Sequence, residues 1–374
     1  MRVALAHDYL REYGGAERVL EALHEVFPTA PIFTAYVNLD AMGENGKRFK
    51  GWRIIPSWFQ KSPFANRLLS PFRIFGPMMF ESFDLSKYDL VISSSSATHL
   101  AKAVITKPET LHISYIHTPP RFLYGYVTSF NYKKHWWTKI GGEIINHFMR
   151  LYDFEVSQRP DILVANSKNI QQRIKKFYRR DSIVIYPPVD LTEIPLKKNK
   201  ENYFLVLNRL VRGKGTEIIV EVATKLNLPL KVAGTGPELN NLKKKASKNV
   251  QFLGWVSDEE RVKLLSNAKA LIVAAEDEDF GITSIEAQAA GTPVIAPASG
   301  GFLETVIDNK TGLLYGGSGM VTVDSLVEAL QKFSARGGPA SGWDPETLRK
   351  NAANFSKEKF KKEILELVKD HLKN

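Results

Sequence analysis

The 374-residue sequence contains no cysteine, which excludes disulfide bonds, thiolate catalysis and cysteine-ligated metal sites. It also lacks any apolar run of the roughly 20 residues that a membrane-spanning helix needs. The opening MRVALAHDYL is too short for a signal peptide and is expected to form the first core strand. Internal repeats and low-complexity segments are absent. We therefore expect a cytosolic globular protein.

Several binding signatures are missing as well. The sequence has no GxGxxG, no P-loop lysine motif, and no RNP, zinc-finger or helix-turn-helix pattern. The chain is nevertheless basic, with a formal net charge of +11, and the surplus lies mainly in residues 1–190, where 25 Lys and Arg face 17 Asp and Glu. Nucleic acid, an anionic membrane surface, a phosphorylated substrate or solvent alone would each be compatible with this surplus.

Short β-branched runs alternate with helix-like segments along the chain, which predicts an α/β protein with parallel sheets covered by helices on both faces. The length favours two domains. The pattern restarts after YPPVD and a polar stretch, so we place the boundary at residues 187–201, where Pro187 and Pro188 end a strand. The expected strands are 3–6, 89–93, 112–116, 162–165 and 183–186, then 203–207, 230–233, 250–253, 270–274 and 293–296.

These boundaries predict a Rossmann-like N-terminal domain at residues 1–190 and a second Rossmann-like domain at residues 191–356. Doubly wound sheets bind ligands beyond the C-terminal ends of their strands, which directs both sites toward a shared cleft. The last helix has apolar residues at helical spacing, and segment 357–374 is expected to pack, in part back on the first domain.

The first candidate binding segment is YGGAER, residues 13–18, between the first expected strand and a helix that ends near residue 26. The adjacent Gly14 and Gly15 permit a tight turn and a close approach to a ligand. The helix start behind them offers free N–H groups and a positive dipole end, which suit phosphate. An ordinary turn would contain the same residues, so both interpretations stay open.

The second candidate segment is NRLVRGKG, residues 208–215, which follows the strand expected at 203–207. Arg209 and Lys214 place cations between the end of a strand and a helix. Cations there suit a diphosphate, because they neutralise the charge that grows as the phosphate leaves. A solvated surface loop is the alternative.

Two carboxylates, Glu278 and Glu286, form the third candidate. A helix is expected from about residue 282, so Glu278 lies in a loop and Glu286 one turn inside the helix, which argues against a hydrolase pair across one bond. Asp277 and Asp279 form a DxD pattern that could hold Mg²⁺ or Mn²⁺ through substrate phosphates. Because the second segment already supplies cations, we expect no metal.

The fourth candidate is HISYIHTPPR, residues 112–121. Alternation along a strand places His112 and His117 on opposite faces. His117, at the C-terminal end of the strand beside a Pro-Pro turn, is expected to reach the ligand site. His112 is expected to be a core histidine.

Together these motifs resemble one family. GGAER, HTPPR, ANS, YPPVD, RLVRGKG, AGTGPE and an E-x7-E pair followed by AGTPVIA occur in the order found in the retaining glycosyltransferases of family 4. The resemblance covers nearly the whole chain and is strongest to bacterial O-antigen and exopolysaccharide mannosyltransferases, which carry HDYL…GGAERVLEAL and HISYIHTPPRFLY-like stretches. It implies the GT-B architecture, two Rossmann-like doubly wound parallel-sheet domains facing a central cleft. Residues 1–190 would then bind the acceptor, and residues 191–356 the nucleotide-sugar.

The resemblance also implies residue roles. Glu278 would bind hydroxyls of the donor sugar, and Glu286 would accept a hydrogen bond from the nucleotide ribose. Arg209 and Lys214 would clamp the diphosphate, with His117 on the sugar and acceptor side. One departure is Asn208, where the family has glycine. The other implied substrate-binding residues are Gly14, Gly15, Gly234, Gly236, Phe280, Gly281, Ile282 and Thr283, with Gly300 and Gly301 near the same ligand.

The implied reaction moves a hexose, first of all mannose from GDP-mannose, onto a lipid-linked glycan acceptor in cell-surface polysaccharide synthesis. It would retain the anomeric configuration by same-face substitution, with the leaving diphosphate taking the acceptor proton and domain closure excluding water. No cofactor and no nucleic-acid partner are expected. The alternatives are a UDP-sugar-dependent transferase of the same family, a GT-B-fold sugar-nucleotide 2-epimerase and a basic nucleic-acid-binding protein.

Residues 52–83 suggest peripheral contact with the inner face of the plasma membrane. Aromatic and basic residues on short, proline-broken segments suit insertion at the headgroup level. The alternative is that the aromatics form the domain core or a protein interface. The residues concerned are Trp52, Trp58, Phe59, Phe64, Phe72, Phe75 and Phe80, interleaved with Arg53, Lys61, Arg67 and Arg73.

Overall fold

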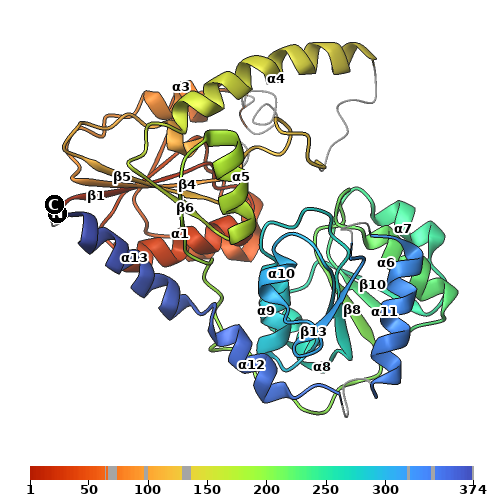
Figure 1. Cartoon of the computed structure of the whole chain (residues 1–374). Coiled ribbons are helices and arrows are strands. Elements are labelled where there is room, and N and C mark those ends of the chain that lie inside the picture. Colours follow the sequence, from red (N-terminus) through yellow and green to blue (C-terminus); the bar gives the residue numbers. More distant parts are fainter. Residues whose placement is uncertain are drawn as a thin grey trace. The chain divides into compact units, whose positions relative to one another are not determined.

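The structure, a computed structural model of the chain, contains two compact α/β units (Figure 1). The first comprises Met1–Tyr126, Tyr132–Pro188 and Glu358–Asn374, and the second comprises Val127–Asn131 and Val189–Lys357. The structure describes all residues except 64, 66–73, 97–99, 129–135, 318–320, 338–341 and 373–374, together with the side chains of 136–139.

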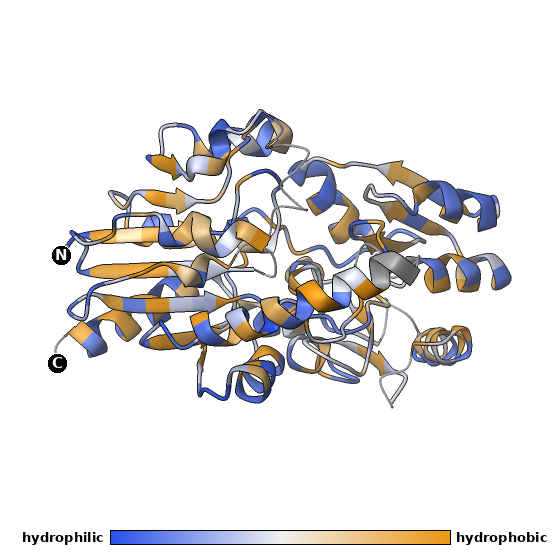
Figure 2. Cartoon of the chain, turned by 90° about the horizontal axis from the view of Figure 1, so that it is seen from above, coloured by the Kyte–Doolittle hydropathy of each residue, from blue (hydrophilic) through white to orange (hydrophobic). Residues whose placement is uncertain are grey.

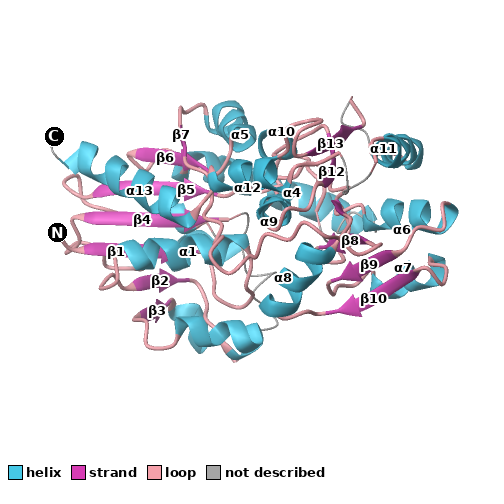
Figure 3. Cartoon of the chain, turned by 90° about the horizontal axis from the view of Figure 1, so that it is seen from below, coloured by secondary structure: helices cyan, strands magenta, loops and turns pink. Residues whose placement is uncertain are grey.

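The first unit is built on a seven-stranded sheet in the order β3-β2-β1-β4-β5-β6-β7, with parallel pairing throughout (Figure 3). Its strands are largely hydrophobic in Figure 2, as expected where helices cover both faces. They are β1 (Val3–His7), β2 (Ile32–Thr34), β3 (Ile54–Pro56), β4 (Leu90–Ser95), β5 (Leu111–Ile116), β6 (Ile162–Ala165) and β7 (Ile183–Val184).

Alternating strand residues fill two cores in this unit. Leu5 and Leu90 pack toward α1 and α13, whereas Ala4 and Val91 pack toward α3 and the end of α4. The C-terminal α13 thus joins the core of the first unit through Phe360, Ile364, Leu367 and Val368. The helices are α1 (Gly15–Val26), α3 (Gly76–Glu81), α4 (Trp136–Val156), α5 (Lys168–Tyr178) and α13 (Lys357–Leu372), with 3-10 helices η1 (Asp40–Phe49), η2 (Trp58–Lys61) and η4 (Ala101–Ala103).

The second unit has a six-stranded parallel sheet in the order β10-β9-β8-β11-β12-β13. Helices α6, α7 and α11 supply Val220, Leu242 and Phe333 to its main core. The strands are β8 (Phe204–Leu207), β9 (Leu230–Ala233), β10 (Val250–Gly254), β11 (Ala270–Ile272), β12 (Val294–Pro297) and β13 (Gly312–Tyr315). The helices are α6 (Thr216–Lys225), α7 (Leu239–Lys245), α8 (Asp258–Asn267), α9 (Ile282–Ala289), α10 (Phe302–Thr305), α11 (Val323–Ala335) and α12 (Pro345–Ala353).

The structure corrects one expectation for residues 52–83. The prediction that these aromatics insert into a membrane is wrong for Phe59 and Phe80, because both are fully buried in the core beside the sheet. Trp52 is partly buried and stacks on His24, with 3.8 Å between ring centroids. Trp58 and Phe75 are exposed. Arg53 and Lys61 are also exposed, and the remaining members of the proposed surface, Phe64, Arg67, Phe72 and Arg73, lie outside the described residues.

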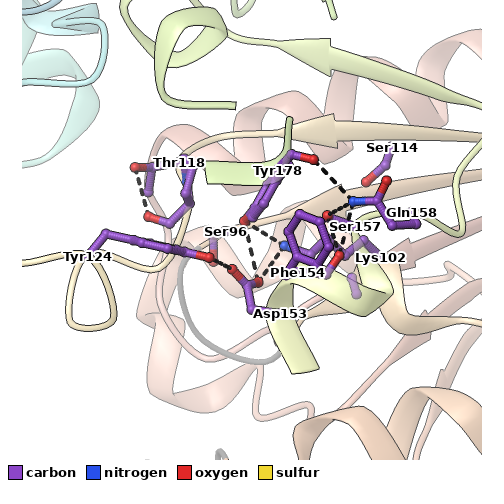
Figure 4. Close-up of polar contacts among 12 residues, drawn as sticks. Ser96, Lys102, Ser114, Thr118, Tyr124, Asp153, Phe154, Ser157, Gln158 and Tyr178 are labelled. Carbon is purple, nitrogen blue, oxygen red and sulfur yellow. Dashed lines mark hydrogen bonds and ion pairs between the residues drawn. The ribbon is translucent and has the colours of Figure 1, made fainter. Parts of the chain in front are cut away.

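A buried ion pair joins four segments of the first unit (Figure 4). Lys102 Nζ in η4 donates to Asp153 Oδ1 in α4 at 2.6 Å and to the Tyr178 hydroxyl in α5 at 2.7 Å. The Tyr124 hydroxyl, from the loop after β5, donates to Asp153 Oδ2 at 2.8 Å. The exposed fractions of the Lys102 and Asp153 side chains are 1% and 0%. The pair therefore fixes the loop that follows His117 against the body of the unit.

We predict that Lys102→Met strongly destabilises the protein. Removing one partner leaves the Asp153 charge buried without compensation, which costs about 3–5 kcal/mol. Lys175→Met is the matched control, since its pair with Asp181 is exposed on both sides and such pairs contribute about 0–1 kcal/mol. Urea unfolding followed by circular dichroism measures both variants. Equal stabilities of the two variants would contradict the role of the buried pair.

Candidate functional site

Each sheet has a point where the strand order reverses. This point lies between β1 and β4 in the first unit and between β8 and β11 in the second. Ligands of doubly wound proteins bind beyond the C-terminal ends of the strands at such points. The sequence-predicted residues fall at these two places. His117 follows β5, next to β4, whereas Arg209 and Lys214 follow β8 and Glu278 follows β11.

A series of polar side chains crosses the switch point of the first unit. His117 Nε2 lies 2.9 Å from Ser94 Oγ, and Ser94 Oγ lies 3.1 Å from His7 Nδ1. His7 Nε2 is 3.5 Å from Glu17 Oε1 in α1. The other oxygen of Glu17 accepts a hydrogen bond from the Gly14 N–H at 2.7 Å. The YGGAER segment and His117 are thus joined through β1 and β4.

Gly14 and Gly15 lie at the start of α1, as predicted. Gly14 is the residue before the helix and Gly15 its first residue. The Glu17 side chain occupies the Gly14 N–H and so closes the helix start in the manner of a capping box.

Asp8 holds the neighbouring loop. Its carboxylate accepts hydrogen bonds from the N–H and the hydroxyl of Ser96 at 3.0 and 2.8 Å, and from the Ala101 N–H at 2.8 Å. These bonds connect the end of β1 with the chain after β4. Ser96 and Ala101 therefore cannot move away from β1 without losing charge-assisted hydrogen bonds.

His117 is neutral at physiological pH in this environment. Burial, and to a smaller extent the neighbouring His7 ring, lowers the pKa of His117 to about 3. The side chain has an exposed fraction of 9%, and within the described residues no hydrogen bond engages its Nδ1 atom. His112 is fully buried on the other face of β5, as predicted, with its Nε2 2.9 Å from Ser93 Oγ.

In the second unit, Lys214 and Glu278 form an ion pair at the switch point. Lys214 Nζ lies 2.7 Å from Glu278 Oε2, and both side chains are mostly but not fully buried. Arg209 begins the same loop and is exposed. Asn208, the departure from the family pattern, accepts a hydrogen bond from the Thr216 hydroxyl at the start of α6 at 3.2 Å.

Glycines allow two pairs of loops to pack closely here. A Cβ on Gly234 would lie 1.8 Å from Asn208 O, and one on Gly236 would lie 2.2 Å from Leu210 O. The AGTGPE turn is therefore packed directly on the NRL loop. Gly300 and Gly301 likewise contact the backbone of Glu278 and Phe280, and the Gly301 N–H donates to Glu278 O at 2.8 Å. This second glycine turn supports the position of Glu278.

The third segment forms a helix as predicted. Gly281, with φ of 91°, precedes α9, and Ile282 and Thr283 are half-buried in its first turn. Phe280 is buried, and its ring lies 5.4 Å from that of Phe355. Glu286 has an exposed fraction of only 4% and forms an ion pair with Arg261 of α8.

Sequence reasoning missed several of these partners. His7, Asp8 and Ser94 have a local signal, since polar residues interrupt apolar strands just before their C-terminal ends. Glu17 is part of the GGAER motif, but the sequence analysis assigned it no role. Arg261 has no such signal, because its partner is 25 residues away and only the fold brings them together. Over the described part of the chain, no group of three or more metal-ligating side chains is found, and no helix there is long and apolar enough to cross a membrane.

Two family models match the chain. Residues 13–193 match the model described as Glycosyltransferase Family 4, and residues 190–369 match the model described as Glycosyl transferases group 1. Among solved structures, HepE of Anabaena in complex with UDP and glucose matches 99% of this chain and 100% of its own, with a TM-score of 0.72 and 16% identity. The fold is therefore GT-B, with two Rossmann-like parallel-sheet domains.

Curated relatives match over shorter stretches. An uncharacterized glycosyltransferase of Methanocaldococcus jannaschii is 29% identical over 158 residues, which are 41% of this chain and 45% of that protein. The GDP-mannose-dependent monoacylated alpha-(1-6)-phosphatidylinositol monomannoside mannosyltransferase of Corynebacterium glutamicum is 35% identical over 138 residues, 33% of this chain and 35% of that protein. The chain thus spans less than half the length of these relatives.

We predict that Gly234→Ala destabilises the protein more than Gly254→Ala. Both glycines have positive φ, so an alanine at either position destabilises the fold by about 1–2 kcal/mol through its backbone conformation alone. Only at Gly234 would the new methyl group collide with backbone, which adds about 1–3 kcal/mol; at Gly254 nothing lies within 4 Å. Thermal unfolding measures the difference. Indistinguishable melting temperatures would show that the two loops are not packed as described.

Proposed function

Because the chain consists of a Glycosyltransferase Family 4 domain followed by a Glycosyl transferases group 1 domain, we propose that it transfers a hexose from a nucleotide-sugar to a hydroxyl of a glycan acceptor. We propose that the transfer retains the anomeric configuration. The observation that carries this proposal is the ion pair of Lys214 and Glu278 at the switch point of the second sheet.

This pair suits the two chemical parts of a nucleotide-sugar. Lys214 can neutralise phosphate oxygens while its other N–H groups still bind Glu278. Glu278 offers acceptor oxygens for sugar hydroxyls. Arg209, exposed in the same loop, would add a second cation for the charge that grows on the leaving diphosphate. The start of α9 beside Glu278 adds backbone N–H groups.

The Ser284 hydroxyl supports the presence of a ligand near this helix start. It lies in the first turn of α9, and it is buried without a hydrogen-bond partner among the residues that the structure describes. A buried hydroxyl left unsatisfied costs about 1–3 kcal/mol, so a bound water or ligand group would be stabilising there. Glu286 is proposed to meet the ribose, with Arg261 orienting its carboxylate.

The donor is proposed to be GDP-mannose. The support is the motif resemblance and the Corynebacterium glutamicum relative, a GDP-mannose-dependent mannosyltransferase by name. HepE was solved with UDP and glucose, so a UDP-sugar is the second candidate donor. In the first domain, His117, Gly14 and Gly15 are proposed to face the sugar and the acceptor. No metal is proposed, because the cations of Arg209 and Lys214 supply positive charge beside the phosphates.

The acceptor is proposed to be lipid-linked and to be met at an anionic membrane surface. In support of this proposal, α4 is rich in hydrophobic residues (Figure 2), and several of them are exposed. Buried Asn146, Met149 and Asp153 mark the opposite, packed side. The exposed residues are Ile140, Ile144, Ile145, Phe148, Leu151 and Phe154.

Charge favours a lipid surface over a second copy of the chain as the occupant of this face. Residues 132–139, which lead into and begin α4, contain three lysines and no acidic residue. The first half of the chain also carries most of the +11 net charge. Two such surfaces would repel each other, whereas an anionic membrane attracts them by about 1 kcal/mol per basic residue near the surface.

We predict that Lys214→Ala and Glu278→Ala have different effects on donor binding, because Lys214 binds the diphosphate and Glu278 binds the sugar. Lys214→Ala should weaken binding of GDP and GDP-mannose alike, because both carry the diphosphate. Glu278→Ala should weaken GDP-mannose only, because GDP has no sugar. Each variant should lower transfer by about tenfold to over a hundredfold. Calorimetric titration and a transfer assay in EDTA measure these effects.

Lys245→Ala is the control for this experiment, since its pair with Glu217 is exposed. It should bind and transfer like the wild-type protein. Four results would contradict the proposal: no thermal stabilisation by any nucleotide-sugar, loss of transfer in EDTA, wild-type transfer in both site variants, or equal loss of GDP binding in both.

We predict that the chain co-sediments with vesicles that contain anionic lipid and that added salt weakens this binding. Replacing Ile144, Phe148 and Leu151 together by Ser should abolish it. Replacing the exposed Trp255, Leu303 and Ile307 of the second domain by Ser should not. Equal sedimentation with neutral vesicles would contradict the lipid proposal. So would a change from dimer to monomer in the α4 variant, which would assign the face to a second copy.

A further inference from the structure

The hydrogen bonds of the series His7–Ser94–His117 have a defined direction, which the charge of the neighbouring Glu17 carboxylate sets. A carboxylate has only acceptor atoms, so it favours the His7 tautomer that carries its proton on Nε2, the nitrogen 3.5 Å from Glu17 Oε1. The remaining nitrogen of a neutral His7, Nδ1, is then an acceptor. It lies 3.1 Å from Ser94 Oγ.

Ser94 links the two histidines, because its hydroxyl can donate one hydrogen bond and accept others. Its hydroxyl has a single proton, and donating that proton to His7 Nδ1 leaves only oxygen lone pairs for other partners. The atom 2.9 Å away on the other side is His117 Nε2. Two lone pairs cannot form a hydrogen bond, so His117 must carry its proton on Nε2.

We propose that Ser94 and His7 are positioning residues that hold His117 in the Nε2–H tautomer, with the lone pair of Nδ1 free to accept a hydrogen bond. The low pKa that burial gives His117 agrees with a neutral ring, which has one donor and one acceptor nitrogen. The partner that such a nitrogen recognises is a hydroxyl donor, not an anion. This inference rests on the proposed function only in naming that partner as a sugar hydroxyl.

Burial makes the arrangement effective. Ser94 and His7 have exposed fractions of 0% and 1%, so water does not compete for their hydrogen bonds. A ring free to exchange tautomers would present an N–H at Nδ1 part of the time, and a hydroxyl would then have to accept instead of donate. Fixing the tautomer removes that second mode and orients the ring.

Nitrogen-15 NMR of histidine-labelled protein tests the tautomer directly, without any assay of transfer. The sequence has eight histidines, and the His117 signals are those lost in His117→Gln. In the wild-type protein, Nε2 of His117 should appear protonated and Nδ1 unprotonated at neutral pH. The reverse pattern, or an averaged one, would overturn the proposal without reference to any variant.

Ser94→Ala should convert the His117 signals to those of a tautomer mixture, and Ser94→Thr, which keeps the hydroxyl, should restore them. Ser93→Ala is the matched control. Ser93 is equally buried one residue earlier in β4 and contacts His112 at 2.9 Å on the opposite face. It should change the His112 signals and leave those of His117 unchanged. Unchanged His117 signals in a folded Ser94→Ala protein would overturn the proposal.

Kinetics separate this inference from the proposed function. If transfer is found, Ser94→Ala should lower kcat by about twofold to tenfold with little change in KM for the donor, as expected from one disturbed hydrogen bond. Ser94→Thr should recover the rate. If the assay shows no transfer while NMR shows the Nε2–H tautomer and its dependence on Ser94, the proposed function fails and the positioning inference stands. If the wild-type protein has the fixed tautomer but Ser94→Ala transfers with wild-type kcat, then Ser94 has no role in catalysis.

Discussion

Parallel strand pairing is the constraint on which both domains depend. A parallel strand must be reached by a crossover, so every strand in each sheet ends at the same edge. In the first domain this brings His7, Ser94 and His117 together from chain positions up to 110 residues apart. In the second it brings Lys214 against Glu278, 64 residues later. The candidate residues are thus neighbours because of the pairing direction, whatever the loops between them contain.

The fold was predictable where the hydrophobic pattern of a strand or helix extends over enough residues to be recognised. All the expected strands are present, with ends within two residues of those predicted, because each is a β-branched run between turn residues. The expectation did not include β2 and β3, which are only three residues long, or β13, whose GLLY begins with glycine. Such short strands are specified by the neighbour they pair with, and a single segment contains too few residues to show alternation.

The sequence predicted which candidate residues lie near the ends of the strands, but it did not predict the partners of their side chains. The motifs and the resemblance named Lys214, Glu278, Glu286 and His117, and α9 starts where the sequence predicted. They did not indicate that Glu286 is buried against Arg261, or that Lys214 is paired with Glu278. Those contacts depend on side chains that meet only after two βα units have packed. The glycine turns show the same limit, since the motifs did not indicate that Gly300 and Gly301 pack against the backbone of Glu278 and Phe280.

The two serine–histidine pairs of the first sheet have the same chemistry but different positions along their strands. Ser93 with His112 and Ser94 with His117 are consecutive across β4 and lie on opposite faces. Burial lowers the pKa of both histidines to about 3, so a shifted pKa does not distinguish them. The positions of the two histidines along β5 distinguish them. His112 lies inside the strand, and its Nδ1 is buried with no hydrogen-bond partner in the described part of the chain. His117 instead follows the last residue of β5, at the edge where parallel strands end. The same chemical pair therefore serves packing on one face and can serve recognition on the other.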